Sequence, residues 1–143
     1  MNWTKFFIAL IASFVFMFAF GYVWWGMLMH NAHMEVPALW RGEAEFKNYF
    51  PWLIGGHIVM PAFLTCLYAG FVSAGGMGAG AKLGAKIGLI FVGNDMISYA
   101  VQPLTMQILG GWALGDFLMF AIAGAIIGAI YKPTTSTSTA PTM

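Results

Sequence analysis

Four long runs of apolar residues, separated by short polar or glycine-rich stretches, dominate the pattern of the chain. They cover about residues 6–29, 51–74, 83–104 and 109–131. A helix needs about 20 mostly apolar residues to cross a bilayer, and each run is that long. The pattern therefore predicts an all-α, four-helix transmembrane bundle within one domain, residues 1–132. The Pro- and Thr-rich remainder, residues 133–143, is expected to be a disordered cytoplasmic tail.

The composition agrees with a membrane protein. Hydrophobic residues make up 60% of the chain and charged residues only 8%, whereas a soluble domain has about 25% charged residues. The first apolar run is longer than the ~7–15 residues of a secretory signal, so we expect it to be retained as a span. A formal net charge of +1 offers no basic field for nucleic acid. Membrane lipid is therefore the expected environment, and nucleic acid is not an expected partner.

Basic residues in the short connections set the expected orientation, because lysine and arginine accumulate on the cytoplasmic side. One predicted side carries only basic charges: Lys5, Lys82, Lys86 and Lys132. On the other side, the first connection, residues 30–49, holds three glutamates against Arg41 and Lys47. The distribution predicts a multi-pass protein of the inner (plasma) membrane with both termini in the cytoplasm.

The stretch GGMGAGAKLGAKIG, residues 75–88, combines a turn signal with a packing signal. Each glycine inside a helix costs up to about 1 kcal/mol relative to alanine, so residues 75–80 are predicted to be a cytoplasmic turn, with the helix resuming near Leu83. Small residues four apart let two membrane helices approach closely. The predicted packing faces, through which helices and copies of the chain would associate, contain Gly84, Gly88, Gly124 and Gly128.

Ionisable residues inside the predicted spans are the first place to look for function. At about 100° per residue, the third span puts Asp95 on the same face as its glycines. The candidate polar intramembrane site contains Asp95, Asp116, His57, Tyr99 and Gln102. Two interpretations remain open: interhelical hydrogen bonds that fix the bundle, or a site for a proton, an ion or a small solute.

A second candidate cluster lies in the segment MLMHNAHME. His30 and His33 are three residues apart and, with Glu35 and His57 nearby, provide ligand types that a divalent metal accepts. Haem ligation by His30 and His57 is less favoured, because their predicted depths differ by roughly 10 Å. The alternative is a histidine pair at the interface with lipid headgroups or water, so the cofactor stays open.

Three segments resemble a known family: the first span closes in GYVWWGMLM, the third opens in GAKIGLIFVGND, and the last ends in GAIIGAIYKP. In these features the layout is similar to a family of small bacterial integral membrane proteins with four predicted helices and no assigned function. The resemblance implies a four-span fold and transfers no site residue.

No segment has the spacing of a phosphate-binding loop or a nucleophile elbow. Enzymatic activity is therefore not expected. The expected function is that of a non-enzymatic integral membrane protein, either self-associating or an accessory subunit of a membrane complex. One alternative is a small proton-coupled transporter or channel that uses the Asp/His cluster. The other is metal or haem binding by the histidines of the outer side.

Overall fold

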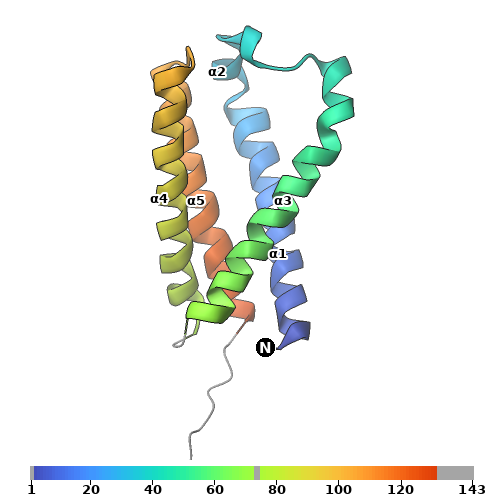
Figure 1. The fold of residues 1–143 in the computed structure, drawn as a ribbon, viewed down its shortest axis with the longest axis vertical. Coiled ribbons are helices and arrows are strands. Elements are labelled where there is room, and N and C mark those ends of the chain that lie inside the picture. The colour runs from blue at the N-terminus through green and yellow to red at the C-terminus, as the bar shows by residue number, and fades with distance from the viewer. Residues whose placement is uncertain (1, 73–74, 132–143) are drawn as a thin grey trace, which may run out of the picture.

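The computed structural model describes residues 2–72 and 75–131, and every regular element within them is helical. In order these are α1 (Trp3–Gly21), the π-helical η1 (Tyr22–Leu28), α2 (His30–Met34), the 3₁₀ turn η2 (Pro37–Leu39), α3 (Glu43–Phe71), α4 (Met77–Val101) and α5 (Met106–Ile130). The start of α1, the α3–α4 turn and the end of α5 lie at one end of the molecule, here the lower end, and α2 lies at the upper end (Figure 1). The tail predicted at 133–143 lies outside the described residues.

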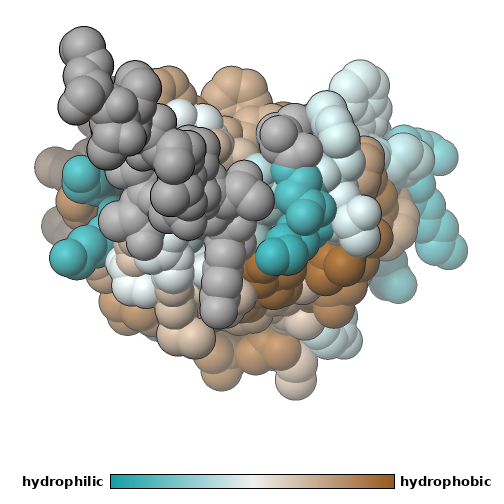
Figure 2. Space-filling model, turned by 90° about the horizontal axis from the view of Figure 1, so that it is seen from below, coloured by the Kyte–Doolittle hydropathy of each residue, from teal (hydrophilic) through white to brown (hydrophobic). Residues whose placement is uncertain are grey.

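Three segments are long and apolar enough to cross a membrane: Trp3–Leu28, α3 and α5. Three of the four predicted spans are therefore confirmed as candidates. α4 is as long as α5 but is not among them, since Lys82, Lys86 and Asp95 interrupt its apolar sequence. Figure 2 shows the lower end with hydrophilic residues scattered among hydrophobic ones.

The turn between α3 and α4 is shorter than the sequence predicts. α4 begins at Met77, so the prediction of a turn through residue 80 is wrong. Gly76 has φ +105°, which only glycine adopts without strain. The Tyr68 hydroxyl accepts a hydrogen bond of 2.7 Å from the Gly76 N–H and so anchors the turn. The helix starts early because Gly80 is buried against α5, and this packing outweighs the low helix propensity of glycine.

The connection after the first span is also more helical than predicted. α3 begins at Glu43, eight residues before the predicted start at residue 51. Glu43 and Glu45 lie in its first turn, where negative charge favours a helix. Arg41 pairs with Glu45 at 2.5 Å, and its guanidinium lies 3.6 Å from the centroid of the Tyr49 ring. These local contacts extend α3 upward past Pro51.

Two groups of buried apolar residues form the interior. The main core joins α1, α3 and α5 and contains Phe6, Ala9, Met17, Leu64, Tyr68, Met119, Phe120, Ala123, Ile127 and Tyr131. The upper core contains Met29, Ala32, Leu104 and Ile108, with Trp24, Trp25, Tyr99 and Trp112 packed around them. α4 joins this framework along α5, while α3 crosses at an angle and leaves a gap that widens toward the upper end (Figure 1).

Candidate functional site

The backbones of α4 and α5 touch along a seam of glycines. A Cβ atom added to Gly84 would collide with the carbonyl oxygen of Phe120, and one added to Gly80 would collide with that of Gly124. At Gly88 the nearest atom would be the Cα of Phe117, at 2.9 Å. Only residues without a side chain permit this approach.

The two glycine faces therefore pack on each other within one chain. Gly124 of α5 faces Gly80 of α4, and Gly128 faces Gly76, the residue just before α4. The sequence analysis expected these faces also to join separate copies of the chain. Because they are already covered, association between copies has to use other surfaces.

The same antiparallel seam brings two carboxyl groups together. Asp95 lies seven residues beyond Gly88 on α4, and the carbonyl oxygen of Asp116 on α5 is 3.2 Å from the Cβ position of Gly88. The Cα–Cβ bonds of a helix tilt toward its N-terminus. Since the helices are antiparallel, the Asp95 side chain tilts downward and that of Asp116 upward. Their carboxyl groups come within hydrogen-bonding reach of each other.

This carboxyl pair is short of a hydrogen-bond donor. Asp95 is only 4% exposed, and its Oδ2 atom is buried without a hydrogen-bond partner in the described part of the chain. Two ionised carboxylates offer only acceptors and repel each other. Among residues 2–72 and 75–131 the only ion pair is Arg41–Glu45, at the upper end. No basic side chain of the described residues therefore pairs with Asp95 or Asp116, and a proton shared between the two carboxyl groups would supply the missing donor.

Apolar side chains lie on both sides of the pair. Below it, Phe91, one turn before Asp95, stacks on Phe120, one turn after Asp116, with a centroid distance of 4.5 Å. Above it, the Trp24 indole lies over Gly115 and donates a hydrogen bond of 2.9 Å to the Gly111 carbonyl. Aromatic rings therefore border the pair on both sides along the bundle.

The π-helical segment η1 aims Trp24 at α5. Its wider turn is closed by a hydrogen bond of 2.9 Å from the Met29 N–H to the Trp24 carbonyl, five residues back. Phe20 stacks on the Trp24 ring at 5.4 Å and holds its orientation. Single π-turns of this kind are frequent at functional sites.

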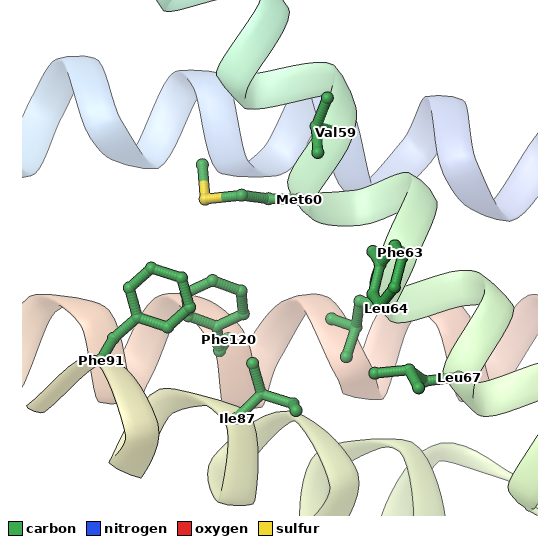
Figure 3. A pocket seen from close by; sticks show the side chains of 8 residues that line it. All are labelled: Val59, Met60, Phe63, Leu64, Leu67, Ile87, Phe91 and Phe120. Carbon is green, nitrogen blue, oxygen red and sulfur yellow. The ribbon is translucent and has the colours of Figure 1, made fainter. Parts of the chain in front are cut away.

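An apolar pocket adjoins the rings below the pair. It has a volume of about 300 Å³ and lies between α3, α4 and α5 (Figure 3). It is lined by Val59, Met60, Phe63, Leu64, Leu67, Ile87, Phe91 and Phe120. The pocket follows from the angle of α3, which leaves its upper half apart from α4.

The structure places His57 away from the two carboxyl groups. Its Nδ1 atom lies 2.9 Å from the Leu53 carbonyl oxygen, and its Nε2 atom faces Gly21 of α1. The ring also meets Phe18 edge-on at 5.4 Å. Of the remaining predicted members of this site, Tyr99 packs on the upper core and Gln102 is exposed at the end of α4. Only Asp95 and Asp116 are brought together.

The metal or haem site predicted at His30, His33 and His57 is not assembled in the structure. Within the described residues no three His, Cys, Asp or Glu side chains come together in a way that could hold a metal ion. His33 instead accepts a hydrogen bond of 3.1 Å from the Trp112 indole, and its ring packs 4.4 Å from that of Trp40. His30 is exposed. His33 therefore fastens α2 to α5.

The hydrogen bond between His33 and Trp112 is expected to weaken in acid. Burial, and secondly the charge of His30, lower the pKa of His33, so the neutral ring accepts the Trp112 hydrogen bond. A group whose pKa is lowered by folding stabilises the protein above its unfolded-state pKa and loses that contribution as the pH falls through the folded-state pKa. We expect acidification to lower the melting temperature of the wild type more than that of His33→Gln, whose amide oxygen accepts without titrating.

The difference should correspond to one hydrogen bond, about 1 kcal/mol. Thermal unfolding in detergent at several pH values measures it, with His30→Gln as the control for the exposed neighbour. Equal pH dependence of His33→Gln and the wild type would show that this contact does not contribute to stability.

Comparison with known proteins does not place the chain in a family. No family model, curated protein or solved structure matches the chain. The resemblance carried by GYVWWGMLM and GAIIGAIYKP therefore stays a prediction, and functional inference depends on the carboxyl pair and its surroundings.

Proposed function

We propose that the chain is a non-enzymatic, multi-pass membrane protein that binds and releases a proton at the Asp95–Asp116 pair, as a small proton-coupled transporter or channel does. The observation that carries the proposal is the buried Asp95 side chain, which lies beside a second carboxyl group and whose Oδ2 atom has no donor among residues 2–72 and 75–131. A proton shared between the two groups supplies that donor and removes the repulsion. Ionisable groups are rare inside membranes and are concentrated on proton and ion pathways.

The proposed membrane arrangement is a four-helix bundle in which α4 is the fourth span. The glycine seam supports this, because it holds α4 against the candidate span α5 from Gly80 to Gly88. Lys82 and Lys86 are exposed in the lower part of α4, where long side chains reach toward the headgroups.

The proposed orientation has both termini on the cytoplasmic side of the plasma membrane. Lys5 lies in the first turns of α1, and Lys82 and Lys86 lie in the first turns of α4, so all three belong to the lower end. Basic residues of short segments favour the cytoplasm. Labelling of a cysteine introduced at Thr4, in a Cys66→Ser background, from either side of a vesicle tests this orientation.

Self-association and an accessory role have less support than the proton site. The glycine faces that suggested them are covered inside the chain. A homo-oligomer or a larger complex would have to form on apolar surfaces outside the glycine seam, and each long helix exposes such a surface.

Infrared spectroscopy of Asp95→Asn tests the proposal. In the wild type we expect a carbonyl band of a protonated carboxyl group that appears and disappears across a pH titration, with uptake of about one proton per chain. Asp95→Asn should change the position of this band and its pH range, because Asp116 loses its partner. The control is Glu35→Gln, which removes an exposed carboxyl group. An unchanged band in Asp95→Asn would refute the shared proton.

A further inference from the structure

The apolar pocket and the carboxyl pair are neighbours, with the stacked rings of Phe91 and Phe120 between them. Phe91 and Phe120 line the upper part of the pocket and lie one helical turn from Asp95 and Asp116 respectively. Figure 3 shows the two rings side by side at one end of the pocket, with Leu67 at the other. The stacked rings are the boundary between the apolar and the acidic part.

The lining restricts what the pocket can hold. All of its lining side chains are apolar, so an anion or a hydrophilic solute would lose its hydration without compensation. The volume of about 300 Å³ is at the lower end of the range for small-molecule sites, ~300–1,000 Å³. Phe63 lies at the exposed rim on α3, so the pocket opens sideways, toward the bilayer.

The carboxyl pair distinguishes between charged and neutral apolar ligands. A neutral acyl chain fills the pocket but leaves the Asp95 carboxyl group without a partner. A ligand with an apolar body and one positive charge complements both parts. The faces of Phe63, Phe91 and Phe120 add attraction, because aromatic rings draw cations to their faces.

We propose that the pocket and the Asp95–Asp116 pair together bind a lipophilic organic monocation, which enters from the bilayer. The inference rests on the proposed function, since the proton that leaves is the one shared by the same two carboxyl groups. One cation enters as one proton leaves, so the charge of the site is conserved. Phe91 is only partly buried, and a rotation of its ring would connect the pocket with the carboxyl groups.

Other titratable side chains of α3 and α4 lie away from the pair: Tyr68 bonds to Gly76 at the lower end, and Cys66 is exposed. His57 of α3 is directed at α1, and Tyr99 of α4 packs on the upper core. Lys82 and Lys86 are exposed. The pH dependence of cation binding therefore reports on Asp95 and Asp116.

Calorimetry with tetraphenylphosphonium, an apolar monocation, tests the proposal on the full chain in detergent. Tetraphenylborate has the same shape and the opposite charge, and we expect it to bind at least about tenfold more weakly. Release of one proton per cation makes the affinity fall on the order of tenfold for each unit of pH in acid, by linkage. Asp95→Asn should shift the pH range of this dependence, because Asp116 then titrates without its partner, and Asp95→Asn with Asp116→Asn should abolish it.

Two matched variants locate the apolar part. Leu67→Trp fills the pocket and should weaken tetraphenylphosphonium binding at least about tenfold. Cys66→Trp, on the neighbouring exposed position of α3, should leave binding unchanged. Equal binding of the borate and the phosphonium, or equal binding by the two tryptophan variants, would overturn the cation site and leave a pocket for lipid chains.

The experiments distinguish a failure of the cation site from a failure of the proton site. If phosphonium does not bind while Asp95→Asn still alters the infrared carbonyl band, the cation site is wrong and the proton pair stands. If the band is unchanged by Asp95→Asn, the proton pair is wrong whatever phosphonium does.

Discussion

Gly84→Ala is expected to separate α4 from α5 and to destabilise the chain strongly. The added Cβ would collide with the carbonyl oxygen of Phe120 and with the backbone of Ala121. Backbone atoms cannot rotate away as a side chain does, so the helices have to move apart. Overpacking of a close contact costs about 1–3 kcal/mol and more where neighbours are fixed. The loss is large relative to a total stability of roughly 5–15 kcal/mol.

Gly93→Ala is the matched control on the same helix. Nothing lies within 4 Å of a Cβ at Gly93, which is exposed on the far face of α4. Here alanine should leave stability unchanged or raise it by up to about 1 kcal/mol through helix propensity. Thermal unfolding in mild detergent, followed by circular dichroism, measures both variants. Equal melting temperatures would show that the seam does not hold the two helices together.

The seam also shows which parts of the helix packing the sequence pattern predicts and which it does not. The four-residue spacing of Gly84, Gly88, Gly124 and Gly128 identified close-packing faces, but not which faces meet. The start of α4 could not be predicted from propensity, because Gly80 is favourable in the helix only once α5 lies against it. Lysine and aspartate residues make α4 less apolar than the three candidate spans, although α4 packs closely along the candidate span α5.

The candidate site was predictable in part. The rarity of ionisable groups in apolar runs identified Asp95 and Asp116, and antiparallel neighbours with short connections bring such residues together. The position of His57 was not predictable, because it depends on the rotation of α3 about its axis, which the pattern leaves undefined. Phe91 and Phe120 had a usable signal, since each lies four residues from a carboxyl group. The π-turn that aims Trp24 has no sequence signal that we can identify.

A double variant, Asp95→Asn with Asp116→Asn, is expected to fold at least as stably as the wild type while losing proton uptake. Two amides at these positions can bond to each other, because each has donors as well as an acceptor. In the proposed four-span arrangement they also avoid the cost of a charge inside the membrane, at least about 2.5 kcal/mol on insertion scales. Asp116→Leu alone should be destabilising, because it leaves Asp95 buried without a partner.

Thermal unfolding and the pH-driven uptake of protons by the purified chain measure the two effects side by side. Interhelical hydrogen bonds that only fix the bundle contribute about 0.6 kcal/mol each on average, and the amide pair would replace them. A structural role therefore predicts a double variant with unchanged stability and no proton uptake in either protein. A double variant that unfolds as readily as Gly84→Ala would contradict both roles. A carboxyl pair in an apolar seam costs stability that an amide pair would not, and binding and release of a proton is a role that amides cannot supply.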